Sequence, residues 1–539
     1  MELDDLRTAA QRLGFRARHA VRWLSPPTWI AVLMSRRATG PAPWASSDQA
    51  PARVKPLEPE ADGSRWFDYV SDTGDGFEAT ATVAHALAAP AIELEWGGRS
   101  VETRRGALLV HGGDMAYPAG TDQVYRDRFI GPYAAMLPAA DPAIPMVAIP
   151  GNHDLYDGLH AWARLMSGES AIGGWRTAQN RSWFFEQVSP QWWVLGVDMQ
   201  RGGEIDDEQR AELVALATQM PAGSDVVVFV PEPAWFRARS IAAQTTHRWV
   251  TEELIGRLGR SSARLFVSGD LHHYSRYEAV DGLAPVDHIT AGGGGAFLSS
   301  THQLPVEADY LGRRIRVSET AIHPSRETSL GLRVRALTLP LRNRSFAAVT
   351  ALAYAVIGFA LAREPGGTDR SLTAALLSLG GLAVTAIVLF GAFAFAQRRT
   401  WQATVAAVLH ASMHIGLAAS ATAIASTGRL GSAAAAAATG AVLGGFVVGV
   451  ALIVSNLLGL NNNELFSAIR IDDYRCFLRF RVDADERLTV FPVAIDQTAR
   501  RWRPNNDEIR PGWSPELVAD DGSDPSLIEA PLSLEPTRD

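Results

Sequence analysis

Residues 146–154 read MVAIPGNHD, an uninterrupted apolar run followed at once by a glycine and three polar side chains. A short apolar run without alternation is typical of a strand covered on both faces. The same arrangement recurs three times, at residues 67–76, 107–117 and 265–273. Ligands of open α/β sheets bind at the carboxyl ends of the strands, so these four stretches indicate both a fold and a site.

From Trp66 to about Phe297 the chain alternates strand-like runs with polar or helical stretches. Further apolar runs lie at residues 192–197 and 226–230, and helical stretches are predicted at 206–220 and 246–259. This alternation predicts an α/β domain with a layered sheet core.

The character of the sequence changes after Pro340. Four long apolar stretches follow, none of which contains Asp, Glu, Lys or Arg: residues 346–361, 372–396, 401–426 and 433–458. Each comes close to or exceeds the roughly 20 residues that cross a bilayer. We therefore expect an all-α bundle of four transmembrane helices. Eight arginines lie between Arg313 and Arg344, so the positive-inside rule predicts a multi-pass cell-membrane protein with both termini in the cytoplasm.

These changes divide the chain into five predicted segments. They are an N-terminal helix with a Pro/Ala-rich linker (1–62), the α/β domain (63–340), four transmembrane helices (345–460), a cytoplasmic β-hairpin segment (461–502) and a disordered tail (503–539). The hairpin is predicted from the alternation of residues 474–482 and 488–493. The N-terminal helix is either an amphipathic surface helix or, through Trp23 and Trp29, an interfacial membrane contact.

Composition argues against a nucleic-acid-binding protein and against a disulfide-stabilised one. The net charge is −8 and the acidic residues are dispersed, so no nucleic-acid partner is predicted. The single cysteine, Cys476, excludes an intramolecular disulfide framework and fits a reducing compartment.

The four loops after the strands carry carboxylate, amide and imidazole groups. Oxygen ligands combined with imidazole suit iron, manganese, zinc or magnesium. Two neighbouring ions can clamp a phosphate and activate a water for attack on it. A glycine before each ligand lets the backbone turn sharply and approach an ion.

The order of these motifs resembles that of the calcineurin-like metallophosphoesterases. The motifs are Asp-x-Gly at 72–74, Gly-Asp-x-x-Tyr at 113–117, Gly-Asn-His-Asp at 151–154 and Gly-x-x-His at 269–272. The Gly74 and Tyr117 variants are most similar to the purple acid phosphatase branch. The resemblance covers about residues 65–300 and implies a layered αββα sandwich and a phosphoric ester hydrolase with two divalent or trivalent metal ions.

The resemblance also implies a role for each matching residue. Asp72 and His272 would bind the first metal, Asp114 would bridge both metals, and Asn152 would bind the second through its amide oxygen. Tyr117 matches an iron-binding phenolate, although a packed turn aromatic is the alternative.

Two further residues match catalytic positions of the family. His153 would face the substrate as general acid or charge stabiliser, and Asp154 would hold it.

Two positions depart from the family pattern. Pro231 stands where a histidine is expected after residues 226–230, and Asp270 replaces the first histidine of the last motif. Asp270 and Glu232 are predicted to replace them, giving an all-oxygen second site that favours manganese, iron or magnesium over zinc. The alternative is a mononuclear or inactive remnant.

The leading interpretation is a membrane-anchored phosphoesterase on the cytoplasmic face. It would hydrolyse a phosphomonoester or phosphodiester, from a small molecule or a lipid, with a metal-bound hydroxide. The alternative is a catalytically impaired domain that binds a phosphorylated ligand and signals to the membrane bundle.

Three features remain outside this interpretation. His410 and His414 share a helix face inside the third predicted span, either as an interhelical polar contact or as a metal or substrate site. The glycine run 292–295 packs tightly near the site or cradles a phosphate. His302, which follows this glycine run, is a further candidate to approach the site.

Overall fold

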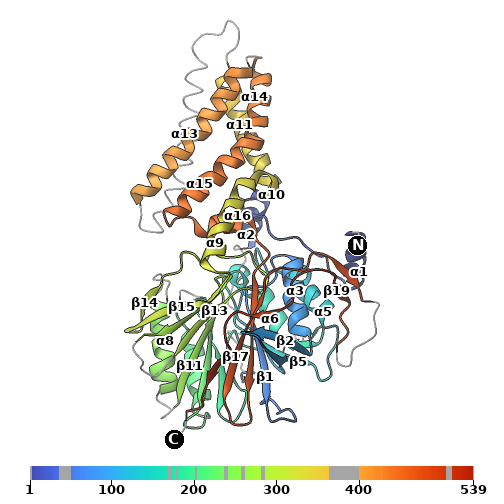
Figure 1. Cartoon of the computed structure of the whole chain (residues 1–539), viewed down its shortest axis with the longest axis vertical. Helices are drawn as coiled ribbons and strands as arrows, with labels where there is room; N and C mark the ends of the chain where they lie inside the picture. Colours follow the sequence, from blue (N-terminus) through green and yellow to red (C-terminus); the bar gives the residue numbers. More distant parts are fainter. Residues whose placement is uncertain are drawn as a thin grey trace. The chain divides into compact units, whose positions relative to one another are not determined.

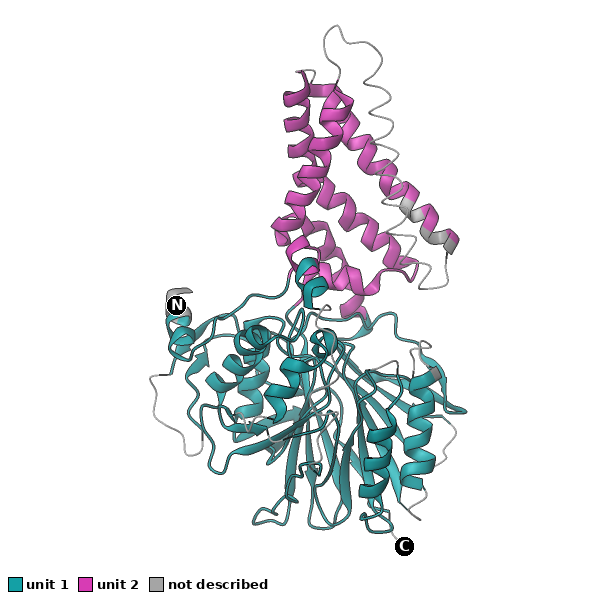
Figure 2. Ribbon diagram, turned by 180° about the vertical axis from the view of Figure 1, so that it is seen from behind, with its two compact units in different colours: residues 1–21, 30–326, 472–539 teal, residues 22–29, 327–471 magenta. Residues whose placement is uncertain are grey.

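The computed structural model describes residues 3–35, 50–167, 171–177, 179–200, 203–235, 241–256, 261–280, 286–362, 400–425, 428–505 and 513–537. The chain forms two compact units (Figure 2). Unit 1 comprises residues 1–21, 30–326 and 472–539, and unit 2 comprises residues 22–29 and 327–471.

Unit 1 is built on two large sheets. The first has the order β20-β17-β16-β1-β4-β5-β7-β6, with β21 paired to β17. Its strands are β1 (Arg65–Val70), β4 (Leu109–His111), β5 (Ile144–Ala148), β6 (Ala171–Ile172), β7 (Trp175–Thr177), β16 (Arg475–Val482), β17 (Leu488–Ile495), β20 (Ser526–Leu527) and β21 (Leu532–Leu534). Strands β1, β4, β5 and β7 run parallel.

The second sheet has the order β14-β15-β12-β13-β11-β10-β9-β8. Its strands are β8 (Phe184–Gln187), β9 (Trp192–Gly196), β10 (Asp225–Val230), β11 (Ser262–Ser268), β12 (Tyr274–Ala279), β13 (Asp287–Ala291), β14 (Glu307–Tyr310) and β15 (Arg313–His323). Strands β9, β10, β11 and β13 run parallel. Two separate pairs complete the strands: β2 (Ala91–Trp96) with β3 (Arg99–Arg104), and β18 (Trp502–Pro504) with β19 (Leu517–Ala519).

The helices of unit 1 lie in the connections between the strands. They are α1 (Leu3–Arg12), α3 (Phe77–Ala88), α4 (Asp122–Tyr125), η1 (Arg126–Ile130), α5 (Gly131–Met136), η2 (Asp154–Asp157), α6 (His160–Ser167), α7 (Asp207–Ala217), α8 (Ile241–Arg248) and η3 (Trp249–Ile255). A further helix, α2 (Pro26–Ser35), spans the division between the units.

The two sheets pack face to face. Their inner faces share one buried cluster, in which the Tyr69 ring of β1 stacks on Phe229 of β10 at 5.2 Å between centroids. Every residue of β10 is buried, as the uninterrupted apolar run predicted. The α/β layering expected from the sequence is therefore confirmed.

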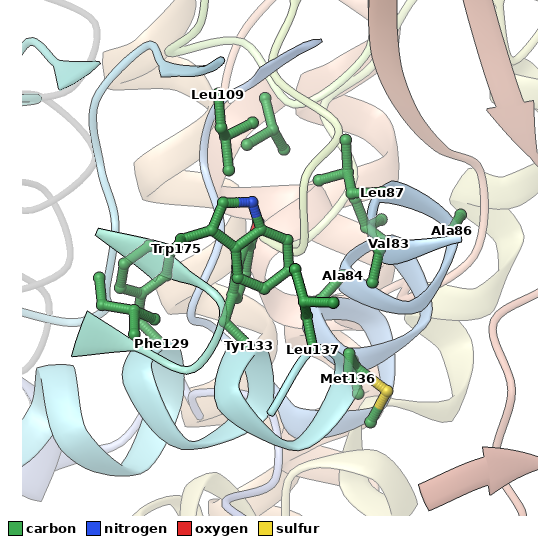
Figure 3. Close-up of a cluster of buried hydrophobic side chains, with 14 of the residues drawn as sticks. Val83, Ala84, Ala86, Leu87, Leu109, Phe129, Tyr133, Met136, Leu137 and Trp175 are labelled. Carbon is green, nitrogen blue, oxygen red and sulfur yellow. The ribbon is translucent and has the colours of Figure 1, made fainter. Parts of the chain in front are cut away.

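Each sheet also buries its outer face. Figure 3 shows α3, α5 and β7 contributing to one such cluster, where Val83 and Leu87 lie near Met136 and Leu137. The Tyr133 ring of α5 meets Trp175 of β7 at 5.3 Å. A separate cluster joins the outer face of the second sheet to α7, α8 and η3. The order of layers is helix, sheet, sheet, helix.

The β16–β17 hairpin completes the first sheet rather than packing on it. Strand β16 pairs antiparallel with β1, so the C-terminal part of the chain and the first strand of the domain are neighbours (Figure 1). Arg479 of β16 is fully buried and its Nε donates to Oδ1 of Asp68 on β1 at 2.8 Å. The segment after the membrane region is thus part of the α/β core.

The prediction of a disordered tail is wrong for the described part of residues 503–539. Strands β20 and β21 pair with β17, and Leu527 and Leu534 are buried. Glu529 is also buried and pairs with Arg276 at 2.8 Å. Single apolar residues spaced along a polar segment, combined with backbone pairing at a sheet edge, are enough to order this tail.

Unit 2 is helical. Its elements are α9 (Arg326–Leu332), η5 (Arg333–Thr338), α10 (Leu339–Arg342), α11 (Arg344–Leu361), α13 (Thr400–Ala425), α14 (Gly428–Thr439), η6 (Gly440–Gly444), α15 (Gly445–Leu457) and α16 (Asn462–Ile469). Within the described residues, three helical stretches are long and apolar enough to cross a membrane: Arg344–Leu361, Val408–Ala425 and Gly428–Leu457. They support membrane association. The second predicted span, residues 372–396, lies outside the described residues.

Two kinds of contact join these helices. A side chain on Gly358 of α11 would lie 2.6 Å from Cβ of Ala436 on α14, so small residues allow these helices to approach closely. The Tyr354 hydroxyl of α11 lies 2.7 Å from Nδ1 of His414 on α13, and Nε2 of His414 lies 2.8 Å from Nε2 of His410. Of the two interpretations of this histidine pair, the interhelical polar contact is the one present here.

Candidate functional site

Four loops meet where parallel strands of both sheets end. Residues 71–76 follow β1, 112–117 follow β4, 149–154 follow β5 and 269–273 follow β11. Three aspartates in these loops have left-handed backbones: Asp72 (φ 57°), Asp114 (φ 52°) and Asp270 (φ 64°). Non-glycine residues in this region are strained, and such strain concentrates at functional sites.

The hydroxyl of Tyr117 lies at the centre of the site. It is 3.0 Å from Oδ1 of Asp72, 3.2 Å from Oδ2 of Asp114 and 3.1 Å from Nε2 of His272. All four residues are buried, at 5% exposure or less. The structure therefore brings together the residues predicted for the first metal and the bridging carboxylate.

Close backbone approach explains two of the glycines. A Cβ on Gly269 would lie 1.9 Å from Oγ of Ser71 and 2.4 Å from Oδ2 of Asp72, while one on Gly151 would lie 2.0 Å from Oδ1 of Asp114. The Ser71 hydroxyl donates to Oδ2 of Asp72 at 2.6 Å. The Asp72 carboxylate is thus held tightly between two loops.

His272 presents one ring nitrogen to the cluster. Its Nδ1 lies 2.6 Å from the carbonyl oxygen of Phe297, so Nδ1 carries the proton and donates to that oxygen. Nε2 then faces the Tyr117 hydroxyl and, at 3.5 Å, Oδ1 of Asp72. Metal-binding histidines are oriented in this way, by a hydrogen bond from the nitrogen that does not bind the metal.

Negative charge is concentrated at Asp114. Burial, together with the carboxylates of Asp72, Asp154 and Asp270, raises the pKa of Asp114 well above its ordinary value. Burial and the carboxylates of Asp114 and Asp72 likewise raise the pKa of Tyr117. A cation in the cluster would offset this repulsion.

The donor set fits a metal ion by its chemistry. Two carboxylates, a phenol and an imidazole are ligands of iron, manganese and related ions. Among the described residues, no three His, Cys, Asp or Glu side chains are grouped so as to hold a metal by themselves. The Tyr117 hydroxyl occupies the point on which the neighbouring donors converge.

His153 is oriented by the backbone. Its N–H donates to Oδ1 of Asp114 at 2.8 Å, and its ring Nδ1 lies 2.7 Å from the carbonyl oxygen of Pro118. The half-buried ring packs on Tyr117 at 4.5 Å between centroids.

Asp154 has a different role from the predicted one. Its carboxylate accepts the backbone N–H groups of Asp114 (2.8 Å), Gly151 (2.9 Å) and Met115 (3.2 Å), and the Tyr125 hydroxyl at 2.7 Å. Burial raises its pKa to about 6. The prediction that Asp154 holds the His153 imidazole is therefore corrected: Asp154 fixes the backbone of two ligand loops.

His111 was not predicted. It is fully buried at the end of β4, where its Nδ1 accepts the N–H of Gly113 at 3.2 Å and its Nε2 lies 3.1 Å from Oγ1 of Thr73. Burial lowers the pKa of His111 to about 3, so the ring is neutral. Its position immediately before Gly112-Gly113-Asp114 was the signal available in the sequence.

The residues predicted for the second metal are only partly gathered. The Asp270 N–H donates to Oδ2 of Asp72 at 3.0 Å, which places Asp270 beside the cluster. Asn152 is half-buried and its Nδ2 donates to the Tyr156 hydroxyl at 3.2 Å. Glu232 is half-buried, two residues beyond the end of β10, and its metal role stays a prediction.

The glycine run 292–295 packs tightly. The N–H of Gly292 donates to the His273 carbonyl at 3.2 Å, and that of Gly294 to the Ser71 carbonyl at 2.9 Å. A Cβ on Gly293 would lie 2.5 Å from the sulfur of Cys476. These N–H groups serve the backbone that supports Asp72.

Residues 66–205 match the family model of the calcineurin-like phosphoesterases. This stretch, about a quarter of the chain, is similar to the calcineurin-like phosphoesterase domain. The matched region contains Asp72, Asp114, Tyr117 and His153, while His272 lies beyond it. The match supports phosphoester hydrolysis generally, and this family uses divalent metals.

No curated protein matches the chain. Among solved structures, the chain is similar to a purple acid phosphatase from yellow lupin seeds, with 14% identity over 50% of this chain and 49% of that chain and a TM-score of 0.31. It is also similar to PhoD, with 12% identity over 46% of this chain and 60% of that chain and a TM-score of 0.29. The chain thus spans about half the length of the purple acid phosphatase.

Proposed function

We propose that the chain is a membrane-anchored, metal-dependent phosphoric ester hydrolase whose active site is the cluster around Tyr117. The observation that carries this proposal is the convergence of Asp72, Asp114 and His272 on the Tyr117 hydroxyl, within 3.2 Å, at the carboxyl ends of parallel strands. The match of residues 66–205 to the calcineurin-like phosphoesterases supports phosphoester hydrolysis as the reaction of that cluster.

Two metal ions complete the proposed site. Asp72, His272 and Tyr117 would hold one ion, and Asp114 would be shared with a second. When bound, the ions supply Lewis-acid activation of water and neutralise the charge of the phosphate. Burial and the neighbouring carboxylates raise the pKa of Asp114, and bound cations would offset the cost of ionising it.

Asn152, Asp270 and Glu232 complete the second site. Together with Asp114 they form an all-oxygen set, which favours manganese, iron or magnesium over zinc. Asp270 and Asn152 are half-buried, whereas Asp72 and Asp114 are buried, so the residues that would hold the second ion are the more exposed ones.

His153 assists the leaving group. The contact of its Nδ1 with the Pro118 carbonyl orients the ring beside Tyr117, and protonation at Nε2 would make the ring a donor to the leaving oxygen. Asp154 acts through the backbone, since it holds the N–H groups of Asp114 and Gly151.

Membrane anchoring brings the site to phosphoesters near a bilayer. The three apolar helical stretches support association with a membrane. By the positive-inside rule, the arginines before the first span favour a site on the cytoplasmic face. The substrate is a small phosphoester or a lipid phosphoester.

The test is hydrolysis of bis(p-nitrophenyl) phosphate by the detergent-purified full chain with Mn²⁺. His153→Ala is expected to lower kcat by roughly 10²–10⁴-fold, the range for loss of a general acid. His19→Ala is the matched control, because that side chain is 77% exposed. Equal rates for wild type and His153→Ala would refute the proposed role of His153.

One observation favours a second function. Pro231, which has no metal-binding side chain, follows β10 where the family resemblance expects a histidine. The second candidate is therefore a catalytically impaired domain that binds a phosphorylated ligand and signals to the membrane helices. Binding of the diester by the Mn²⁺-loaded wild-type chain without any hydrolysis would favour this candidate.

A further inference from the structure

A short helical segment of unit 2 precedes the first candidate membrane span. Helices α9, η5 and α10 follow one another without a break as far as Arg342, and α11 begins at Arg344. Together the three helices are shorter than the roughly 20 residues that cross a bilayer, and they contain arginines, so they are not a span themselves. We call residues 327–344 the juxtamembrane segment.

One side of the juxtamembrane segment packs on α15. The buried apolar residues of the segment are Leu332, Ala336 and Leu339. A Cβ on Gly449 of α15 would lie 2.2 Å from the carbonyl oxygen of Ala336, and one on Gly445 would lie 2.7 Å from Cγ of Pro340. These two glycines let the segment lie directly against α15, which belongs to a candidate membrane span.

The same segment exposes a second set of apolar side chains. They recur at the three- and four-residue spacing of one helix face and are between 39% and 78% exposed: Leu330, Val334, Leu337 and Leu341. A helix that faces water carries polar residues on the side away from the core. Apolar side chains on both sides are expected where the outer side meets lipid instead of water.

The charged residues of the segment after Glu327 are all basic. Residues 328–344 contain neither Asp nor Glu and have four arginines: Arg333, Arg335, Arg342 and Arg344. The last two are exposed, whereas the first two are half-buried on either side of Val334. An arginine extends its apolar stem along a hydrophobic surface and keeps its guanidinium at the polar boundary. Guanidinium groups bind phosphate oxygens in a bidentate manner, so these charges favour anionic headgroups.

The N-terminal part of unit 2 meets the start of the same span. Nη1 of Arg22 donates to Oγ of Ser345, in the first turn of α11, at 3.1 Å. Residues 22–29 belong to unit 2, and Trp29 at their end is exposed. Tryptophan is enriched at membrane–water interfaces, and arginine in the loops that flank spans. Two separate stretches of unit 2 therefore have the composition of a membrane interface.

We propose that the juxtamembrane segment is a docking surface for anionic phospholipid and lies in the membrane interface. Its exposed apolar side chains enter the boundary between headgroups and acyl chains, and its arginines bind the headgroup phosphates. Apolar spans alone anchor a protein in any bilayer, whereas this surface selects anionic lipid. The inference rests on the membrane association in the proposed function and is independent of the metal site.

The test measures lipid contacts by fluorescence quenching. The full chain is labelled with a nitrobenzoxadiazole maleimide at Leu341→Cys and placed in nanodiscs of phosphatidylcholine and phosphatidylglycerol. Cys476 is buried, and wild type treated with the same reagent gives the background. Phosphatidylglycerol and phosphatidylcholine with a nitroxide near the headgroup are compared at equal mole fraction. We expect phosphatidylglycerol to quench at least about twofold more strongly, because the neighbouring arginines attract it.

A second label separates the docking surface from membrane anchoring itself. Leu352 is exposed on α11, and at about 1.5 Å per residue it lies about 12 Å along the helix axis from Arg344. The label at Leu352→Cys should be quenched most by a nitroxide near the end of the acyl chain, and the label at Leu341→Cys by one near the headgroup. Absence of quenching at both positions would refute membrane anchoring. Quenching at Leu352→Cys alone would refute the docking surface only.

Two double variants test the arginines at equal net charge. Arg335→Gln/Arg342→Gln, with the label at Leu341→Cys, should lower the preference for phosphatidylglycerol by at least about half. Arg99→Gln/Arg248→Gln removes the same charge from exposed positions on β3 and α8 and should keep the preference. Thermal unfolding verifies that both double variants fold. Equal quenching by the two lipids in the labelled parent chain, or an unchanged preference in Arg335→Gln/Arg342→Gln, would overturn the proposal.

Discussion

The Tyr117 hydroxyl lies 3.1 Å from Nε2 of His272, although 155 residues separate the two in sequence. Tyr117 follows β4 of the first sheet and His272 follows β11 of the second. The candidate site therefore exists only when the two sheets have packed face to face, and its geometry depends on the buried core between them.

Replacing Tyr117 tests whether the phenol is a ligand. Tyr117→Phe removes the hydroxyl on which Asp72, Asp114 and His272 converge, so metal content should fall by about one ion per chain. Elemental mass spectrometry of the detergent-purified protein measures this directly.

Tyr133→Phe is the matched control for that change. Tyr133 is fully buried, and its hydroxyl finds no hydrogen-bond partner in the described part of the chain, so its loss should leave metal content unchanged. If Tyr117→Phe retained the metal content of wild type, the phenol would be a packed turn aromatic.

Replacing Asp270 tests the rebuilt second site. Asp270→Asn keeps a side chain that tolerates the left-handed backbone at φ 64° and removes one carboxylate beside Asp114. We expect manganese affinity at the second site to fall by roughly 10–100-fold, measured by titrating Mn²⁺ against hydrolysis of an aryl phosphodiester.

The control for Asp270 is Asp309→Asn, an exposed aspartate on β14 that should titrate like wild type. Unchanged Mn²⁺ dependence and metal content in Asp270→Asn would show that Asp270 does not replace the missing histidine.

Local sequence patterns predicted the strands and the residues around Tyr117. Asp72, Asp114 and His272 each follow an apolar run closely. Ligand sites of parallel α/β sheets lie at the carboxyl ends of the strands, so these residues were expected to lie close together. The role of Asp154 was not predictable in this way, because its partners are backbone N–H groups that only the folded loops direct toward it.

Pairing with a distant strand also explains why the C-terminal segment is ordered, which the sequence did not predict. Leu527 and Leu534 are isolated apolar residues in a polar segment. Their partner strand is β17, which belongs to a sheet in which β16 pairs with β1, and such pairings between distant segments are not visible in the local sequence. The linker before the domain behaves similarly, since Arg53 and Val54 are held by Glu186 of β8.

Glu186 should make stability depend on pH. Burial outweighs its ion pair with Arg53 and raises its pKa from an ordinary 4.5 to about 7. A carboxyl with a raised pKa holds its proton more tightly when folded, so the free energy of unfolding falls as pH rises from 4.5 to about 7. The loss reaches at most about 3 kcal/mol, at 1.36 kcal/mol per pKa unit.

Glu186→Gln provides the comparison. The amide cannot ionise, so unfolding followed by denaturant titration should lose this contribution to the pH dependence while keeping the acceptor for the Val54 N–H. Identical slopes of stability against pH for wild type and Glu186→Gln would show that the carboxyl does not titrate in this window.

The contact between Tyr354 and His414 should stabilise the helical unit without serving the metal site. Tyr354→Phe removes the hydroxyl that lies 2.7 Å from Nδ1 of His414 and so deletes a hydrogen bond between α11 and α13. Interhelical hydrogen bonds in membranes contribute about 0.6 kcal/mol, so a small decrease in thermal stability in detergent is expected. Metal content and diester hydrolysis should match wild type, because the helices only anchor the domain in the proposed function. A large fall in activity or metal content with unchanged thermal stability would instead assign a functional role to the Tyr354–His414–His410 chain.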